Sequence, residues 1–244
     1  MTPSSGRAVT NPVPLRRRVA AEALGTGALT AVVIGSGAMA TSLTDDVGVQ
    51  LLINAVSTGA ALFVLIALLA PVSGAQLNPV VTGVDAAFGQ RHAAGVLGYL
   101  GAQVGGAVAG AAVANLMFDL PVLELAATDR VQTGTLLGEV VATCGLVTVI
   151  FGLVRNGRAP LVAPAVALFI TSAYFFTSST SFANPAVTLG RALSDTFAGI
   201  DPASVAPYIA AQLVGGALGL LVVRAMWPHD DAHLPEDIAM EENA

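Results

Sequence analysis

Long runs without a charged side chain alternate with short polar segments along this chain of 244 residues. A helix needs about 20 mostly apolar residues to cross the hydrocarbon core of a bilayer, and six of the runs come close to or exceed that length. A soluble domain has no use for so many such stretches, so the pattern predicts a helical membrane protein. The predicted spans cover about 19–42, 49–70, 93–118, 135–154, 159–178 and 205–226.

The arginines favour one orientation of these spans. With six crossings both chain ends lie on the same side of the membrane, and eight of the ten arginines fall on that side, the exceptions being Arg130 and Arg191. By the positive-inside rule we expect both termini in the cytoplasm and the protein in the cell (plasma) membrane. The expected organisation is a basic cytoplasmic tail (1–18), a membrane domain (19–226) and an acidic cytoplasmic tail (227–244).

Composition excludes several function classes. Only 11% of the residues are charged, whereas a typical soluble domain has about 25%. Six of the sixteen acidic residues stand between His229 and Ala244, and no basic cluster that would bind nucleic acid is present. The sequence has no Ser-His-acid set, metal-ligand cluster or phosphate-binding loop, so we expect neither an enzyme nor a cofactor. Cys144 is the only cysteine, which excludes an internal disulfide.

The two halves of the membrane domain repeat one another. The pattern Y-x-x-A-Q-x-x-G-x-x-x-G begins at Tyr99 in the third span and at Tyr208 in the sixth, and the first and fourth spans open with Glu22 and Glu139. Each copy has three spans, an odd number, so the second copy must be inverted in the membrane. Inverted repeats place the functional site near the midplane, between the copies. The copies cover about 19–118 and about 135–226.

A shared N-P-x-V-T motif begins at Asn78 and again at Asn184, 106 positions later. Asn is a preferred helix N-cap and Pro is favoured at the first helical position, so each motif predicts a helix start. A helix that starts at the end of an apolar run must be buried in protein or line a cavity. A half-helix of about 10 residues spans about 15 Å, half the hydrocarbon thickness. We therefore predict two half-helices that enter from opposite faces and meet at the centre.

These motifs resemble those of the aquaporin (major intrinsic protein) family. The resemblance covers about 19–226 and rests on Ser73–Pro79 and Ser181–Ala186, and the glutamates and the A-Q-x-x-G segments fit it. It implies an all-α membrane fold of six transmembrane helices and two re-entrant half-helices in an inverted repeat. It also implies a homotetramer in the lipid bilayer and a passive channel for small uncharged solutes.

The predicted arrangement has direct consequences for a pore. The amides of Asn78 and Asn184 offer donors at the midplane, and the positive ends of the two half-helix dipoles converge there, which disfavours cations and protons. Glu22 and Glu139 are the acids that we place within spans. An intramembrane acid is by default a functional hypothesis, in its sharpest form a proton relay. The resemblance implies instead that the two glutamates brace the half-helix loops, and we favour that interpretation.

The selectivity filter departs from the pattern of the family. In most members an arginine follows the second motif at once, and here that position is Val187. Register from the motifs, counted without gaps, puts the other filter positions at Thr58, Ser172 and Ser181. These four side chains would leave a wide filter that selects poorly for water over larger neutral solutes, such as polyols or metalloid hydroxides. By resemblance, channels without the filter arginine include some associated with bacterial arsenic detoxification, which makes arsenous acid a candidate.

Arg191 lies one turn beyond Val187, so its side chain could reach the outer vestibule of the pore. We favour the alternative that it pairs with Asp195 at i, i+4 on a wetted helix face. Gln76 stands where the family often has histidine, so we expect no gating by a histidine there.

Two other functions stay open at this stage. An ion- or proton-coupled secondary transporter would also use inverted repeats and half-helices, with Glu22 or Glu139 as the coupling group. A membrane scaffold protein with little flux could keep the same fold. The polar residues at the predicted filter argue mildly against the scaffold, because a closed pore need not be lined by Thr and Ser.

Overall fold

The computed structural model describes residues 13–89 and 93–228, and in these residues the regular structure is entirely helical. Six helices are long and apolar enough to cross a membrane, and two short helices begin at the two Asn-Pro motifs. The predicted all-α fold with six spans and two half-helices is thus confirmed. Most of the predicted basic tail and almost all of the acidic tail, with His92 and its neighbours, lie outside the described residues. The long helices are α1 (Leu15–Leu43), α2 (Val47–Ser73), α4 (Ala93–Met117), α5 (Thr133–Arg155), α6 (Val162–Phe176, after the 3-10 turn Ala159–Leu161) and α8 (Pro202–Met226); the short ones are α3 (Pro79–Ala87) and α7 (Pro185–Arg191).

Local signals set several of the helix boundaries. Asp46 caps α2 by accepting a hydrogen bond from the backbone of Val49 at 3.1 Å. Asp201 caps α8 in the same way, from the backbone of Ala203 at 2.7 Å, and Pro202 takes the first helical position. α2 ends at Ser73, and the next residue, Gly74, has a φ of 91°, which is costly for residues with a side chain. The start of α2, the end of α2 and the start of α8 are therefore set by residues that can be identified in the sequence itself.

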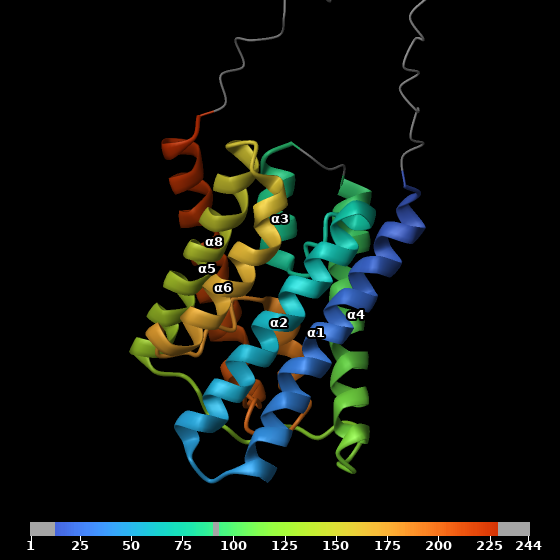
Figure 1. The fold of residues 1–244 in the computed structure, drawn as a ribbon, viewed down its shortest axis with the longest axis vertical. Helices are drawn as coiled ribbons and strands as arrows, with labels where there is room; N and C mark the ends of the chain where they lie inside the picture. Colours follow the sequence, from blue (N-terminus) through green and yellow to red (C-terminus); the bar gives the residue numbers. More distant parts are fainter. Residues whose placement is uncertain (1–12, 90–92, 229–244) are drawn as a thin grey trace, which may run out of the picture.

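Small residues let the helices within each repeat approach closely. α1 packs along α4, and a methyl group at Gly110 would collide with the backbone carbonyl of Gly27. α5 packs along α8 in the second copy, where a methyl group at Gly215 would collide with the carbonyl of Val140. The recurrent glycines of the repeat therefore serve close helix packing, as the small-xxx-small pattern predicts. α2 and α6 pack against each other and join the two copies (Figure 1).

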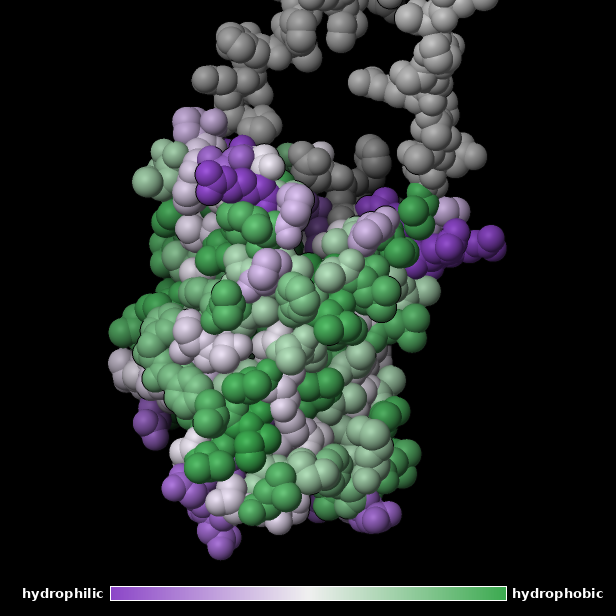
Figure 2. All heavy atoms as spheres, in the orientation of Figure 1, coloured by the Kyte–Doolittle hydropathy of each residue, from purple (hydrophilic) through white to green (hydrophobic). Residues whose placement is uncertain are grey.

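The outer surface is that of a protein immersed in lipid. On the face drawn in Figure 2, apolar residues cover the middle of the molecule and polar residues gather towards both ends. Leu24, Leu97 and Leu168 are 71%, 70% and 72% exposed, which a water-facing surface rarely tolerates in such density. The start of α1 and the end of α8 lie at the same end of the molecule, and the turn between α1 and α2 lies at the opposite end (Figure 1).

Candidate pore

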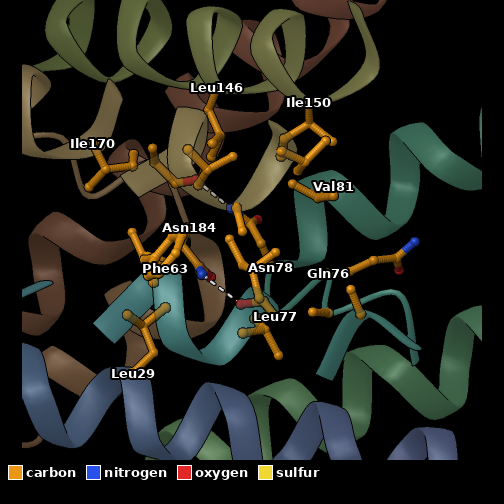
Figure 3. Close-up of a pocket in the computed structure, with 18 of the residues that line it drawn as sticks. Leu29, Phe63, Gln76, Leu77, Asn78, Val81, Leu146, Ile150, Ile170 and Asn184 are labelled. Atoms are coloured by element: carbon orange, nitrogen blue, oxygen red, sulfur yellow. Dashed lines mark hydrogen bonds between the residues drawn. The ribbon is translucent and has the colours of Figure 1, made fainter. Parts of the chain in front are cut away.

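The two asparagines of the repeated motif hold the half-helices together at the centre of the molecule. The Nδ2 of Asn78 donates to the backbone carbonyl of Ala183 at 2.7 Å, and the Nδ2 of Asn184 donates to the carbonyl of Leu77 at 2.7 Å (Figure 3). Each asparagine therefore binds the loop of the other copy. The N-termini of α3 and α7 meet here, as the sequence predicts.

Each asparagine also caps its own half-helix. The Oδ1 of Asn78 accepts from the backbone of Val80 at 2.9 Å, and the Oδ1 of Asn184 accepts from the backbone of Ala186 at 3.0 Å. Because the acceptor oxygen is engaged in the cap, the amide nitrogen must point away from the helix. The same side chain thus starts the helix and presents its donors at the midplane.

The chain before each asparagine adopts an unusual backbone. Leu77 and Ala183 have φ of 50° and 46°, in the left-handed region that residues with a side chain seldom occupy. Their carbonyls are the ones that accept the crossed asparagine bonds. Strain of this kind persists only where its surroundings hold it in place, and it is typical of functional sites.

Glu22 supports the first of these loops from α1. Its carboxylate accepts hydrogen bonds from the Ser73 hydroxyl at 2.6 Å and from the backbones of Gln76 and Leu77 at 3.0 and 2.7 Å. The Nε2 of Gln103 on α4 donates to it as well, at 2.8 Å. The side chain is fully buried, so these donors replace the water that it has lost.

Glu139 supports the second loop in the same manner from α5. It accepts from the backbones of Phe182 and Ala183 at 2.9 and 2.8 Å, and from the Nε2 of Gln212 at 2.6 Å. The paired glutamines were not singled out as site residues from the sequence. Gln103 and Gln212 also donate to the hydroxyls of Thr82 and Thr188 on the half-helices. The signal that could have identified them is their recurrence at the same place in both copies of the repeat.

A cavity of about 750 Å³ passes both asparagines. It extends from Gln76 and Asp85 beside α3 to Val187 and Arg191 on α7. Between these ends its walls are mainly apolar, and Figure 3 shows several of these side chains around the asparagine pair. The apolar wall includes Leu29, Val33, Leu62, Ile66, Val81, Leu146, Ile150, Val166 and Ile170.

Three of the four predicted filter residues line this cavity. Thr58, Ser181 and Val187 do so, whereas Ser172 is exposed on the outside of α6, where its hydroxyl donates to the backbone of Phe169 at 2.8 Å. The placement of Ser172 in the filter is wrong. Tyr174 lines the cavity instead, with its hydroxyl 3.0 Å from that of Thr58. A register error of two residues rotates a helical position by about 200°, from the pore to the lipid side.

Arg191 does not pair with Asp195 on a wetted face, and that interpretation is wrong. α7 ends at Arg191, so Asp195 does not lie on the same helix, and its carboxylate accepts from the backbone of Ala127 at 3.0 Å. Arg191 is only 3% exposed. Its Nε donates to the carbonyl of Ala198, and its guanidinium carbon lies 3.3 Å from the ring centroid of Phe182. Arg191 lines the cavity, at the end beyond Val187.

Comparison with known proteins identifies the family of this fold. The sequence model described as "Major intrinsic protein" matches residues 10–178 and 158–242. Aquaglyceroporin AqpS of Rhizobium meliloti is 47% identical over 210 residues, which are 86% of this chain and 90% of that protein. Aquaporin Z of Bradyrhizobium diazoefficiens is 30% identical over 225 residues, 85% of this chain and 92% of that protein.

Solved structures agree on the fold. The aquaglyceroporin of Plasmodium falciparum superposes with a TM-score of 0.68, covering 88% of this chain and 96% of that chain at 22% identity. Such identity supports the fold alone, whereas the sequence matches extend over nearly the whole membrane domain. The chain belongs to the major intrinsic protein family.

Proposed function

We propose that this protein is a passive channel for small uncharged solutes, including polyols and metalloid hydroxides such as arsenous acid. The observation that carries the proposal is the cavity past the crossed asparagines, with Thr58, Tyr174, Ser181 and Val187 at its outer end. No arginine follows the second motif directly, so the filter keeps more space than an arginine at 187 would leave. The 47% identical relative is named an aquaglyceroporin, which supports solutes larger than water.

The wall chemistry fits a neutral solute. Apolar side chains offer nothing to bind along most of the cavity, and the donors of Asn78 and Asn184 replace part of the hydration of a solute at the midplane. The converging N-termini of α3 and α7 raise the energy of a cation there. We therefore expect the free energy of a neutral hydroxylated molecule to have neither a deep minimum nor a high barrier along the cavity.

The contacts of the two glutamates favour bracing over coupled transport. Every described partner of Glu22 and Glu139 is a donor that belongs to a half-helix loop or to a residue that supports one. A coupling group must exchange protons or ions during transport, and a carboxylate buried under several donors is poorly suited to that. Major intrinsic proteins are channels rather than enzymes, in keeping with the absence of catalytic motifs from the sequence.

We further propose a homotetramer in the plasma membrane with both termini in the cytoplasm. The arginine distribution supports the orientation, and family membership supports the assembly.

The filter that we propose keeps three of the expected residues, Thr58, Ser181 and Val187, and has Tyr174 in place of Ser172.

Stopped-flow light scattering on proteoliposomes tests this function. Water efflux is compared with re-swelling under glycerol and arsenous acid gradients, for the parent, Val187→Arg and Val187→Met. Fast re-swelling in the parent that falls about tenfold in Val187→Arg and much less in Val187→Met would support a solute channel whose selectivity is set at 187. Fast water efflux without re-swelling would overturn the wide filter, and no flux of either kind would favour a transporter or a scaffold.

A further inference from the structure

The two half-helices carry opposite charges at equivalent positions. Asp85 stands seven residues after Asn78, and Arg191 stands seven residues after Asn184. Both line the cavity, Asp85 at the end near α3 and Arg191 at the end near α7. The seventh position after the asparagine is therefore a cavity-lining position in both copies of the repeat.

The residue two positions before each asparagine contacts this charged side chain. The Nε2 of Gln76 donates to the Oδ2 of Asp85 at 2.7 Å. The ring of Phe182, which is the equivalent of Gln76, receives the guanidinium of Arg191 on its face. The same pair of positions thus holds a carboxylate in one copy and a guanidinium in the other, and the partner is changed to match: an amide donor for the anion, an aromatic face for the cation.

The surroundings of Arg191 hold its charge in place without neutralising it. Its Nε is bound to the Ala198 carbonyl, and within residues 13–89 and 93–228 no carboxylate forms an ion pair with it. Arg130 also contacts the Phe182 ring, and its guanidinium carbon lies 5.4 Å from the ring centroid. Its side chain donates hydrogen bonds to the carbonyls of Phe197 and Gly199 at 3.0 and 2.6 Å. Consecutive carbonyls at 197–199 therefore fix two arginines about one ring.

Another polar group, the Ser181 hydroxyl, lies at this end of the cavity. The Ser181 hydroxyl is buried and lines the cavity, and among the described residues it has no hydrogen-bond partner. A buried hydroxyl without a partner costs free energy unless something else satisfies it. A solute or water in the cavity would do so.

We propose that Arg191 supplies the fixed positive charge of the outer filter. It lies one turn beyond position 187, where most members of the family carry an arginine and this chain has valine. The charge excludes cations from an opening that Thr58, Tyr174, Ser181 and Val187 leave wide and neutral. The guanidinium donors that face the cavity, with the Ser181 hydroxyl, bind the oxygen acceptors of passing hydroxylated solutes. This inference rests on the proposed channel function and assigns its charge selectivity to one residue.

Urea and guanidinium are suitable probes, because they are nearly equal in size and shape and differ in charge. Uptake of each labelled compound into proteoliposomes is measured for the parent, and the guanidinium-to-urea ratio is the readout. Two uncharged variants are compared, Arg191→Gln and Arg191→Met; the methionine keeps the contact with Phe182. Arg191→Lys keeps the charge. Arg16→Gln removes an exposed arginine at the start of α1 that does not line the cavity and serves as the matched control.

A fixed unit charge close to the path of an ion changes the energy of that ion strongly, because the surroundings of the cavity are less polar than bulk water. We expect the ratio to rise about tenfold or more in Arg191→Gln and Arg191→Met and to stay near that of the parent in Arg191→Lys and Arg16→Gln. Urea uptake in the same vesicles reports that each variant is folded and open. An unchanged ratio in variants that still conduct urea would overturn the role of Arg191 and leave the channel function standing. A parent that conducts neither urea nor glycerol would overturn the proposed function itself.

Discussion

The two half-helix loops share one supporting framework and differ at the openings of the cavity. In each copy a buried glutamate binds two backbone N–H groups of the loop, a glutamine links that glutamate to a threonine of the half-helix, and an asparagine binds the loop of the other copy. Gln76 and Asp85 at one opening are then replaced by Phe182 and Arg191 at the other. The symmetric residues support the fold, and the asymmetric ones give each opening its own charge.

Removing a glutamate tests the shared framework, with the largest expected effect. In Glu22→Gln or Glu139→Gln, one backbone N–H would face an amide N–H, and each buried donor left without an acceptor costs about 1–3 kcal/mol. We expect the glycerol flux per protein to fall about tenfold or more in both variants. Flux is measured by stopped-flow re-swelling, beside Glu124→Gln in an exposed loop. Equal effects would support equivalent roles; parental flux in either variant would show that its loop does not need the carboxylate.

Packing within the repeats is tested with one helix carrying both a variant and its control. Gly110→Ala on α4 places a methyl group against the Gly27 carbonyl, whereas Gly101→Ala on the same helix meets no atom within 4 Å. We expect Gly110→Ala to lower the free energy of unfolding by about 1–3 kcal/mol. Gly101→Ala should be neutral or stabilise by about 0.5–1 kcal/mol. Thermal unfolding in detergent measures both.

The same packing test extends to the second copy. Gly215→Ala should resemble Gly110→Ala, because its methyl group would meet the Val140 carbonyl. A tolerated Gly215→Ala would mean that α5 and α8 can separate where α1 and α4 cannot, and the equivalence of the copies would fail there.

The partners of the two charges offer a finer test of the asymmetry. Phe182→Leu removes the ring under Arg191, an interaction worth about 0.5–2 kcal/mol, so we expect the guanidinium-to-urea flux ratio to rise about threefold to tenfold. Gln76→Leu removes the donor to Asp85 at the other opening, and we expect the ratio to change less than about twofold. The comparison uses the same uptake measurement. A larger change in Gln76→Leu than in Phe182→Leu would place the control of charge selectivity at the inner opening.

The smallest expected effect concerns the hydrogen bonds of Asp129, which lies in the loop between α4 and α5. Hydrogen bonds from the Val131 backbone and the Ser204 hydroxyl lower the pKa of Asp129 below its ordinary value of 3.8. A carboxyl group whose pKa is lower in the folded state than in the unfolded state stabilises the fold at pH values above its unfolded-state pKa. This stabilisation is lost as the pH falls through the folded-state pKa. Asp129→Asn should therefore lower the melting temperature slightly at pH 6, and the difference should shrink below pH 3.8. A difference that is the same at every pH would mean that the charge of Asp129 contributes nothing.

The sequence predicted the spans, the half-helices and the paired glutamates because their signals are local or recur in both copies. An apolar run reports the thickness that it must cross, and Asn followed by Pro reports a helix start, whatever the rest of the chain does. The copies then confirm each other, since a feature seen at 78 and again at 184 is unlike a chance pair.

Only the tertiary structure decided the filter and the place of Arg191. Ser172 and Tyr174 are two residues apart on α6, and which of them faces the cavity depends on how that helix is rotated against α2. Whether Arg191 turns to water or to the cavity depends on where α7 ends and on Phe182 and Ala198, which contact it from outside the helix. These choices are made between segments of the chain, where neither periodicity nor motif spacing carries information.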